Sequence, residues 1–147
     1  MADRRQAMLA QCRSAIGARR RQAEVRHADA LRALDAAEAA RMQAGEMLHA
    51  AERDWNGQMR ARFDPLLGVL LGRELRERAE QVVRADRLAR DAATARAGTE
   101  AAWRCEDGRW RMLDDAVAAA RADAARRADE ALLTAAADRL CFQWSAR

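Results

Sequence analysis

The chain has 147 residues, a length that fits one domain, and its 27 basic residues exceed its 23 acidic residues to give a net charge of +4. Every basic residue is arginine, more than a quarter of the chain is alanine, and only 4% is aromatic, so the side chains that fill a wide core are scarce. No apolar run approaches the roughly 20 residues that cross a bilayer, and arginines interrupt the first twenty residues, so we expect neither a membrane span nor a signal peptide.

Three cysteines, Cys12, Cys105 and Cys141, lie far apart in the chain. Their number is odd, and none stands at the spacing of a zinc ligand pair, so a disulfide framework or a zinc site is not expected. This cysteine usage predicts a reduced, cytoplasmic protein.

The first predicted element is a helix over about residues 3–62, because residues with high helix propensity dominate there and β-branched residues are few. Two rows of residues recur along it every seven positions, which is typical of a coiled coil. The first row is Ile16, Ala23, Ala30, Ala37, Ala44 and Ala51; the second is Arg20, His27, Leu34, Arg41, Leu48 and Trp55.

A reversal of the chain is predicted between residues 56 and 72. Asn56-Gly57 is one candidate, as a C-terminal helix cap. Asp64-Pro65 is the other, as an N-cap followed by proline in the first helical position, and we place the reversal near Asp64.

The second predicted helix covers about residues 66–143 and keeps a seven-residue phase through most of its length. One row is Leu75, Val82, Ala89, Arg96, Trp103, Trp110, Val117, Ala124 and Ala131; a second is Ala85, Ala92, Thr99, Glu106, Leu113 and Ala120. The prediction is an all-α fold, one long antiparallel coiled-coil hairpin over residues 1–147. A three-helix bundle with breaks near Gly45 and between Gly98 and Gly108 is the alternative, and the unbroken phase favours the hairpin.

Catalysis is not expected. His27 and His49 have no positioned partner for acid–base chemistry, and no serine or threonine stands in a nucleophilic arrangement. Phosphate-binding glycine motifs are missing, so we predict no cofactor, no metal and no small-molecule substrate. Trp55, Trp103 and Trp110 fall on the heptad rows and are interpreted as packing residues.

Three surfaces are candidates for binding a partner. Residues 1–28 contain seven arginines and two acidic residues, a net charge of +5, whereas the remaining residues sum to −1. Such a basic end suits an acidic protein surface or a nucleic acid, although a solvated helix face has the same composition. The basic candidates are Arg4, Arg5, Arg13, Arg19, Arg20 and Arg21.

The other two surfaces are apolar. Phe142 and Trp144 lie beyond the heptad rows, either as exposed anchors for a partner or folded against the N-terminal helix. Five aliphatic residues cluster at the predicted tip of the hairpin, where an exposed patch would mark a contact site and a buried one would only cap the seam. These residues are Leu66, Leu67, Val69, Leu70 and Leu71.

The basic opening Met1-Ala-Asp-Arg-Arg5, the heptad arms and the reversal around Asp64-Pro65-Leu66-Leu67-Gly68 make the chain resemble the central-stalk proteins of type III secretion ATPases (the FliJ/YscO family). The resemblance covers nearly the whole chain but is one of length and pattern, without a sharp motif. It implies a coupling protein whose paired termini enter a hexameric ATPase and whose other end reaches the export-gate ring protein. It also implies possible export chaperones as partners, and a cytoplasmic site peripheral to the inner membrane.

Two alternatives remain open at this point. The first is a generic coiled-coil scaffold or adaptor that self-associates through Leu66 to Leu71. The second is an arginine-rich nucleic-acid binder, for which the support is weak because no DNA- or RNA-binding module is present.

Overall fold

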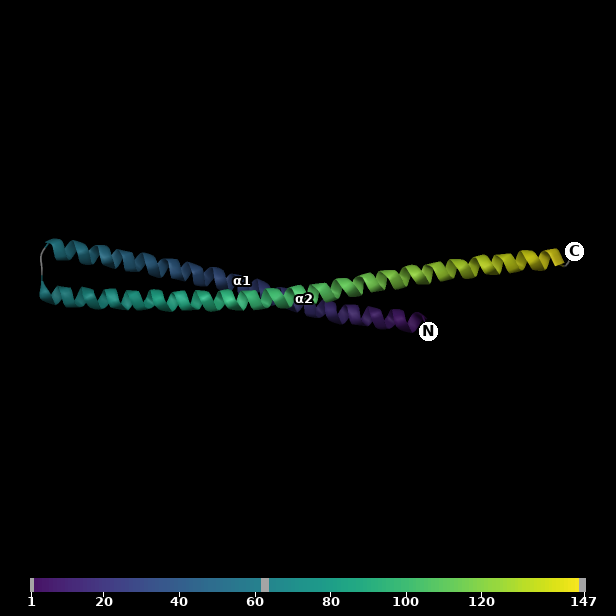
Figure 1. Ribbon diagram of the computed structural model, residues 1–147, viewed down its shortest axis with the longest axis horizontal. Coiled ribbons are helices and arrows are strands. Elements are labelled where there is room, and N and C mark those ends of the chain that lie inside the picture. The colour runs from purple at the N-terminus through teal and green to yellow at the C-terminus, as the bar shows by residue number, and fades with distance from the viewer. Residues whose placement is uncertain (1, 62–63, 146–147) are drawn as a thin grey trace. The chain divides into compact units, whose positions relative to one another are not determined.

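A computed structural model describes residues 2–61 and 64–145, except for the side chains of residues 2, 3, 5, 6, 143 and 145. The chain forms two helices, α1 (Ala2–Ala61) and α2 (Pro65–Ser145), which pack against each other as an antiparallel hairpin (Figure 1). The all-α hairpin predicted from the heptad rows is confirmed.

The start of α2 depends on Asp64 and Pro65. One carboxylate oxygen of Asp64 accepts a hydrogen bond from the backbone N–H of Leu66 at 2.9 Å, and the backbone carbonyl of Asp64 accepts another from Gly68 at 2.9 Å. Asp64 therefore caps the N–H groups that the first helical turn leaves without partners, and Pro65 occupies the first helical position, where its missing N–H costs nothing.

Two alternatives from the sequence are wrong. Asn56 and Gly57 lie within α1, so they do not end the first helix, and Gly57 keeps a negative φ. Gly45 lies inside α1, and Gly98 and Gly108 lie inside α2, which removes the breaks that a three-helix bundle needs. An interior glycine costs a helix about 1 kcal/mol, and packing between the arms outweighs that cost here.

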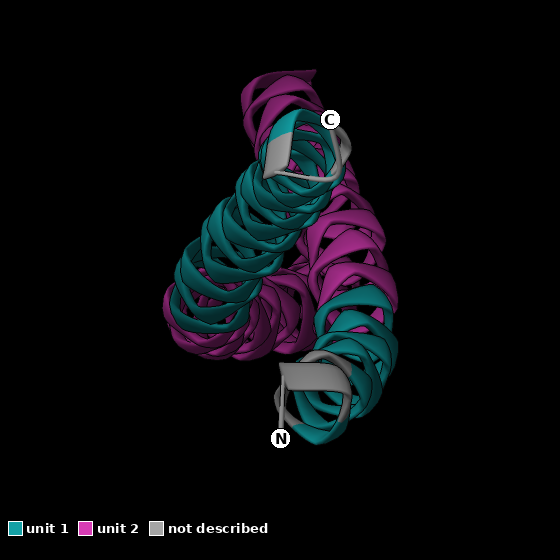
Figure 2. Cartoon of the chain, turned by 90° about the vertical axis from the view of Figure 1, so that its right-hand side faces the viewer, with its two compact units in different colours: residues 1–22, 104–147 teal, residues 23–103 magenta. Residues whose placement is uncertain are grey.

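The described residues form two compact units (Figure 2). The larger one contains residues 23–103, and we call it the turn unit. The other contains residues 1–22 and 104–147, and we call it the terminal unit.

In the turn unit the heptad rows face the partner helix. Ala89 is the most buried residue there, with 6% of its surface exposed. The ring of Trp55 lies against Gly72, where an added Cβ would come within 3.4 Å of the ring. His27 and Trp103 stack with centroids 6.0 Å apart and planes at 11°. Aromatic rings thus fill the gaps that an alanine-rich seam leaves, and the interpretation of the tryptophans as packing residues is confirmed for this unit.

The terminal unit is packed around Val117, which is 7% exposed, with Gly17 and Trp110 beside it. An added Cβ on Gly17 would lie 3.5 Å from the indole nitrogen of Trp110, so the backbone of α1 approaches the ring closely. Asp107 is also buried, at 7% exposure. This seam therefore holds a charged residue next to its apolar centre.

One register describes the contacts inside each unit. The paired residue numbers add up to 127 for Arg20 with Asp107 and for Arg13 with Asp114 in the terminal unit, and for Arg41 with Asp86 in the turn unit. Position 125 of α2 is therefore opposite Ala2, since 127 − 2 = 125. Later residues of α2 have no residue of α1 opposite them, and the yellow end of α2 continues past the purple start of α1 (Figure 1).

Beyond that point α2 is open to solvent. Every residue from 125 to 144 whose side chain is described is exposed. The sequence-based assignment of Ala131 to the buried row is therefore wrong, because the row continues in sequence where the opposing helix has already ended.

Candidate functional site

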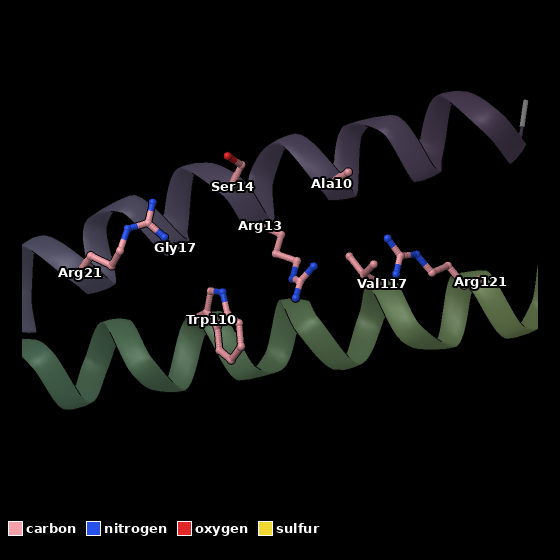
Figure 3. A pocket seen from close by; sticks show the side chains of 8 residues that line it. All are labelled: Ala10, Arg13, Ser14, Gly17, Arg21, Trp110, Val117 and Arg121. Atoms are coloured by element: carbon pink, nitrogen blue, oxygen red, sulfur yellow. The ribbon is translucent and has the colours of Figure 1, made fainter.

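The clearest candidate site is a cleft between the two helices of the terminal unit, with a volume of about 290 Å³ (Figure 3). α1 supplies small residues and two arginines to its lining, and α2 supplies a ring, a valine and a third arginine. The lining residues are Ala10, Arg13, Ser14, Gly17, Arg21, Trp110, Val117 and Arg121. We call this the arginine cleft.

Trp110 organises the guanidinium groups around the cleft. The guanidinium carbon of Arg20 lies 4.9 Å from the centroid of the Trp110 ring, and that of Arg13 lies 5.6 Å from it. Both distances are within the range of cation–π attraction, which holds the cations near the ring face. The ring is only half-buried, so it offers a stacking surface as well as a packing contact.

Acidic residues of α2 neutralise these same two arginines. Arg13 donates to Asp114 at 2.6 Å, and Arg20 donates to Asp107 at 2.6 Å. Asp107 also accepts from Arg111, at 2.8 Å, so its buried carboxylate is held between two cations. A buried carboxylate needs such partners, because removing a charge from water is costly unless it is paired.

Arg21 and Arg121 are different. Neither side chain makes a hydrogen bond or ion pair with any residue in the described part of the chain, and both are exposed where they line the arginine cleft. A free guanidinium presents a planar fork of donors that matches a carboxylate. The cleft therefore combines Arg13, whose charge Asp114 neutralises, with Arg21 and Arg121, whose charges no described side chain neutralises.

The basic residues selected from the sequence divide accordingly. Arg13 and Arg20 are occupied by aspartates of the same chain, whereas Arg4, Arg19 and Arg21 are exposed; the side chain of Arg5 lies outside those described. Arg121 was not selected, because it lies in the arm with balanced charge. Counting back from a turn at Asp64 would have placed it beside the start of α1.

The apolar tip residues also divide. Leu66, Val69 and Leu70 are 71%, 70% and 58% exposed, and these three form what we call the tip patch. Leu67 and Leu71 are half-buried and belong to the end of the seam.

Phe142 and Trp144 lie in the single-helix part of α2, at 75% and 87% exposure. The alternative that Trp144 folds against the N-terminal helix is wrong, since α1 has no residue opposite it.

Each of the two histidines contacts one polar side chain. His49 contacts Glu52 at 3.0 Å on the surface of α1, and His27 lies in the seam with Thr99 at 3.5 Å. The described part of the chain contains no cluster of three or more histidine, cysteine or acidic residues that could hold a metal ion. Nor does any described helix carry an apolar stretch long enough to span a bilayer.

Comparison with known proteins adds no relative: no family model, no curated protein and no solved structure matches this chain. The site must therefore be interpreted from its own chemistry.

Proposed function

We propose that this chain is a non-enzymatic coupling protein of a type III secretion ATPase, which binds the hexameric ATPase through the terminal unit and the export-gate ring through the tip patch. The single observation that carries the proposal is the arginine cleft, which is lined by a half-exposed tryptophan and by two arginines whose side chains have no ion-pair partner in the described part of the chain.

The chemistry of the cleft favours an acidic protein partner. Arg21 and Arg121 supply forked donors for carboxylates, and Trp110 supplies an aromatic surface of the type found at the centres of protein interfaces. A nucleic acid is a weaker candidate, because Asp107 and Asp114 already neutralise part of the positive charge that phosphate groups would need.

A single hairpin inside a six-fold ring also suits the proposed role. It is asymmetric, so it can contact only some of the six subunits at one time. The ATPase subunits would then differ in conformation, which favours ring assembly and firing in sequence. Export chaperones are further partners that the resemblance implies.

Co-purification with a hexameric secretion ATPase from the same organism, together with the ATP hydrolysis rate, tests the proposal. Wild type should bind and stimulate the ATPase. The variant Arg21→Glu, Arg121→Glu should lose both effects while keeping its helical circular dichroism, because neither residue holds the hairpin together. Arg20 is unsuitable for this test, since its pair with Asp107 is part of the seam.

A matched control reverses two exposed arginines of α1 outside the terminal unit, Arg53→Glu and Arg60→Glu, with the same change in net charge. It should bind the ATPase as wild type does. If both variants lose binding equally, net charge alone explains the loss and the arginine cleft is not the binding site. If the wild-type protein does not bind the ATPase, the proposal is wrong.

A second candidate function, an adaptor that self-associates through its apolar tip, is favoured by the exposure of the tip patch. The variant Leu66→Asp, Leu70→Asp should then become monomeric in sedimentation. A wild-type protein that is already monomeric would exclude this candidate.

A further inference from the structure

The end of α2 carries large apolar side chains that are exposed in the described part of the chain. Beyond position 125 the helix has no opposing residue of α1, yet it contains Leu132, Leu133, Leu140 and Phe142 at exposures of 69%, 71%, 64% and 75%. We call residues 125–144 the terminal extension. Large apolar side chains at this density on one exposed helix indicate a contact surface.

The apolar residues of the terminal extension do not continue the seam of the hairpin. The seam row ends with Val117 and Ala124, and its next members would be Ala131 and the acidic Asp138. A new row begins one residue later, at Ala125 and Leu132. Since one residue turns an α-helix by about 100°, the new row faces a different direction. The exposed apolar stripe of the extension is thus distinct from the seam of the hairpin.

The apolar stripe of one copy is complementary to the same stripe of a second copy when the two helices run antiparallel. In heptad terms, Ala125, Leu132 and Arg139 form one core row, and Asp129 and Ala136 belong to the other. When two copies are aligned so that facing residue numbers add up to 268, Leu132 faces Ala136 of the second copy, since 132 + 136 = 268. Large residues therefore lie opposite small ones, as close packing requires.

The same alignment also places opposite charges next to each other. Asp129 faces Arg139 of the second copy, since 129 + 139 = 268, and two-fold symmetry creates this pair twice. Neither side chain makes an ion pair or hydrogen bond within the described part of its own chain. The hairpin seam already uses the same kind of pair, in Arg20 with Asp107.

The residues that flank the core rows are also apolar. Leu133 and Leu140 border one side of the stripe, and Ala128, Ala135 and Phe142 border the other. The alignment pairs residues 124–144 of one copy with residues 144–124 of the other, so the exposed helix is covered over its whole length.

We propose that two copies of this chain associate through their terminal extensions as an antiparallel helix pair. A membrane surface is a less suitable binding partner for the extension, because the extension contains three arginines and three acidic residues and has no basic face. The interface is at the small end of the range for specific complexes, so the dimer should dissociate on dilution. This inference does not depend on the proposed role in secretion.

Sedimentation equilibrium of the full chain over a wide concentration range tests the proposal. Wild type should follow a monomer–dimer equilibrium. Leu132→Asp, Leu140→Asp should weaken the dimer at least about a hundredfold, because each copy loses two buried leucines. The matched control Thr134→Asp, Cys141→Asp adds the same charge on the opposite side of the same helix turns and should dimerise as wild type.

A charge exchange tests the alignment itself and leaves the apolar residues in place. Asp129→Arg or Arg139→Asp alone should weaken the dimer about tenfold, and the double variant should restore it. A wild type that is monomeric at all concentrations overturns the proposal. So does a dimer that survives Leu132→Asp, Leu140→Asp, or one that is lost with Leu66→Asp, Leu70→Asp at the tip patch. A double charge variant that stays as weak as the single ones overturns the antiparallel alignment.

Discussion

Two ion pairs with the same heptad position and the same register should differ strongly in their contribution to stability. Arg20 with Asp107 is short, at 2.6 Å, and the Asp107 side chain is only 10% exposed. Arg41 with Asp86 is longer, at 3.6 Å, with side-chain exposures of 51% and 32%. Both pairs are salt bridges, so the difference in their contribution to the free energy of unfolding should come from the difference in burial.

The magnitude for Arg20→Ala follows from what the substitution removes. A hydrogen bond to a charged group is worth about 1.5–3 kcal/mol, and a partly desolvated cation–π contact such as that with Trp110 adds roughly 0.5–2 kcal/mol. Arg111 remains on Asp107 and prevents the full cost of an unpaired buried charge. We expect a loss of about 2–4 kcal/mol. For Arg41→Ala we expect about 0–1 kcal/mol, the range of exposed pairs.

Urea unfolding followed by circular dichroism at 222 nm measures both values, with the slope of the transition compared between variants. Asp107→Ala and the double variant Arg20→Ala, Asp107→Ala complete a cycle, from which we expect a coupling free energy above about 1 kcal/mol. Costs for Arg20→Ala and Arg41→Ala that agree within about 0.5 kcal/mol would refute the reasoning, as would a coupling near zero.

Three further substitutions probe the helices and the seam. Asp64→Ala should cost about 1 kcal/mol in urea unfolding because the cap of α2 is lost, and Asp64→Asn, which still accepts the N–H of Leu66, should cost much less; equal costs would argue against capping. Gly98→Ala should stabilise the protein by about 0.5–1 kcal/mol, since an added Cβ meets nothing within 4 Å, and an unchanged or lower melting temperature would contradict this. Trp103→Ala should destabilise by about 2–3 kcal/mol through loss of the stack on His27, with Trp103→Phe as the milder control; a Phe variant as unstable as the Ala variant would show that the ring stack is unimportant.

Local signals in the sequence were enough for the helices and for the place where they meet. Asp64-Pro65 combines a capping side chain with a fixed φ, and both act within one turn of helix, so the start of α2 could be predicted without knowledge of the rest. The heptad rows were equally informative, because a seven-residue repeat has few other physical explanations.

The interaction surfaces could be predicted only in part. Arg13 and Arg20 belong to the basic opening, but the aspartates that neutralise them lie far away in sequence and become visible only once the register is known. The sequence alone offers no reason to select Arg121, because positive and negative charges are balanced in its own helix. It lines the arginine cleft because the antiparallel alignment places it opposite the first turns of α1. Composition gives the net charge of a segment, whereas a binding site depends on which charged side chains remain without an ion-pair partner once the two helices are aligned.

The constant sum of 127 has a consequence for slippage between the arms. Asp107 and Asp114 are seven residues apart, so sliding one helix by a single heptad would bring Arg20 to Asp114, or Arg13 to Asp107. Either slide would place an alanine opposite Arg41 in place of Asp86, so the pair in the turn unit favours the observed alignment. Only residues 62–64 separate α1 from α2, and a connection that short leaves no slack for such a slide. The short connection thus adds to the pair of Arg41 with Asp86 in holding the alignment, and an insertion of seven residues there would remove that constraint.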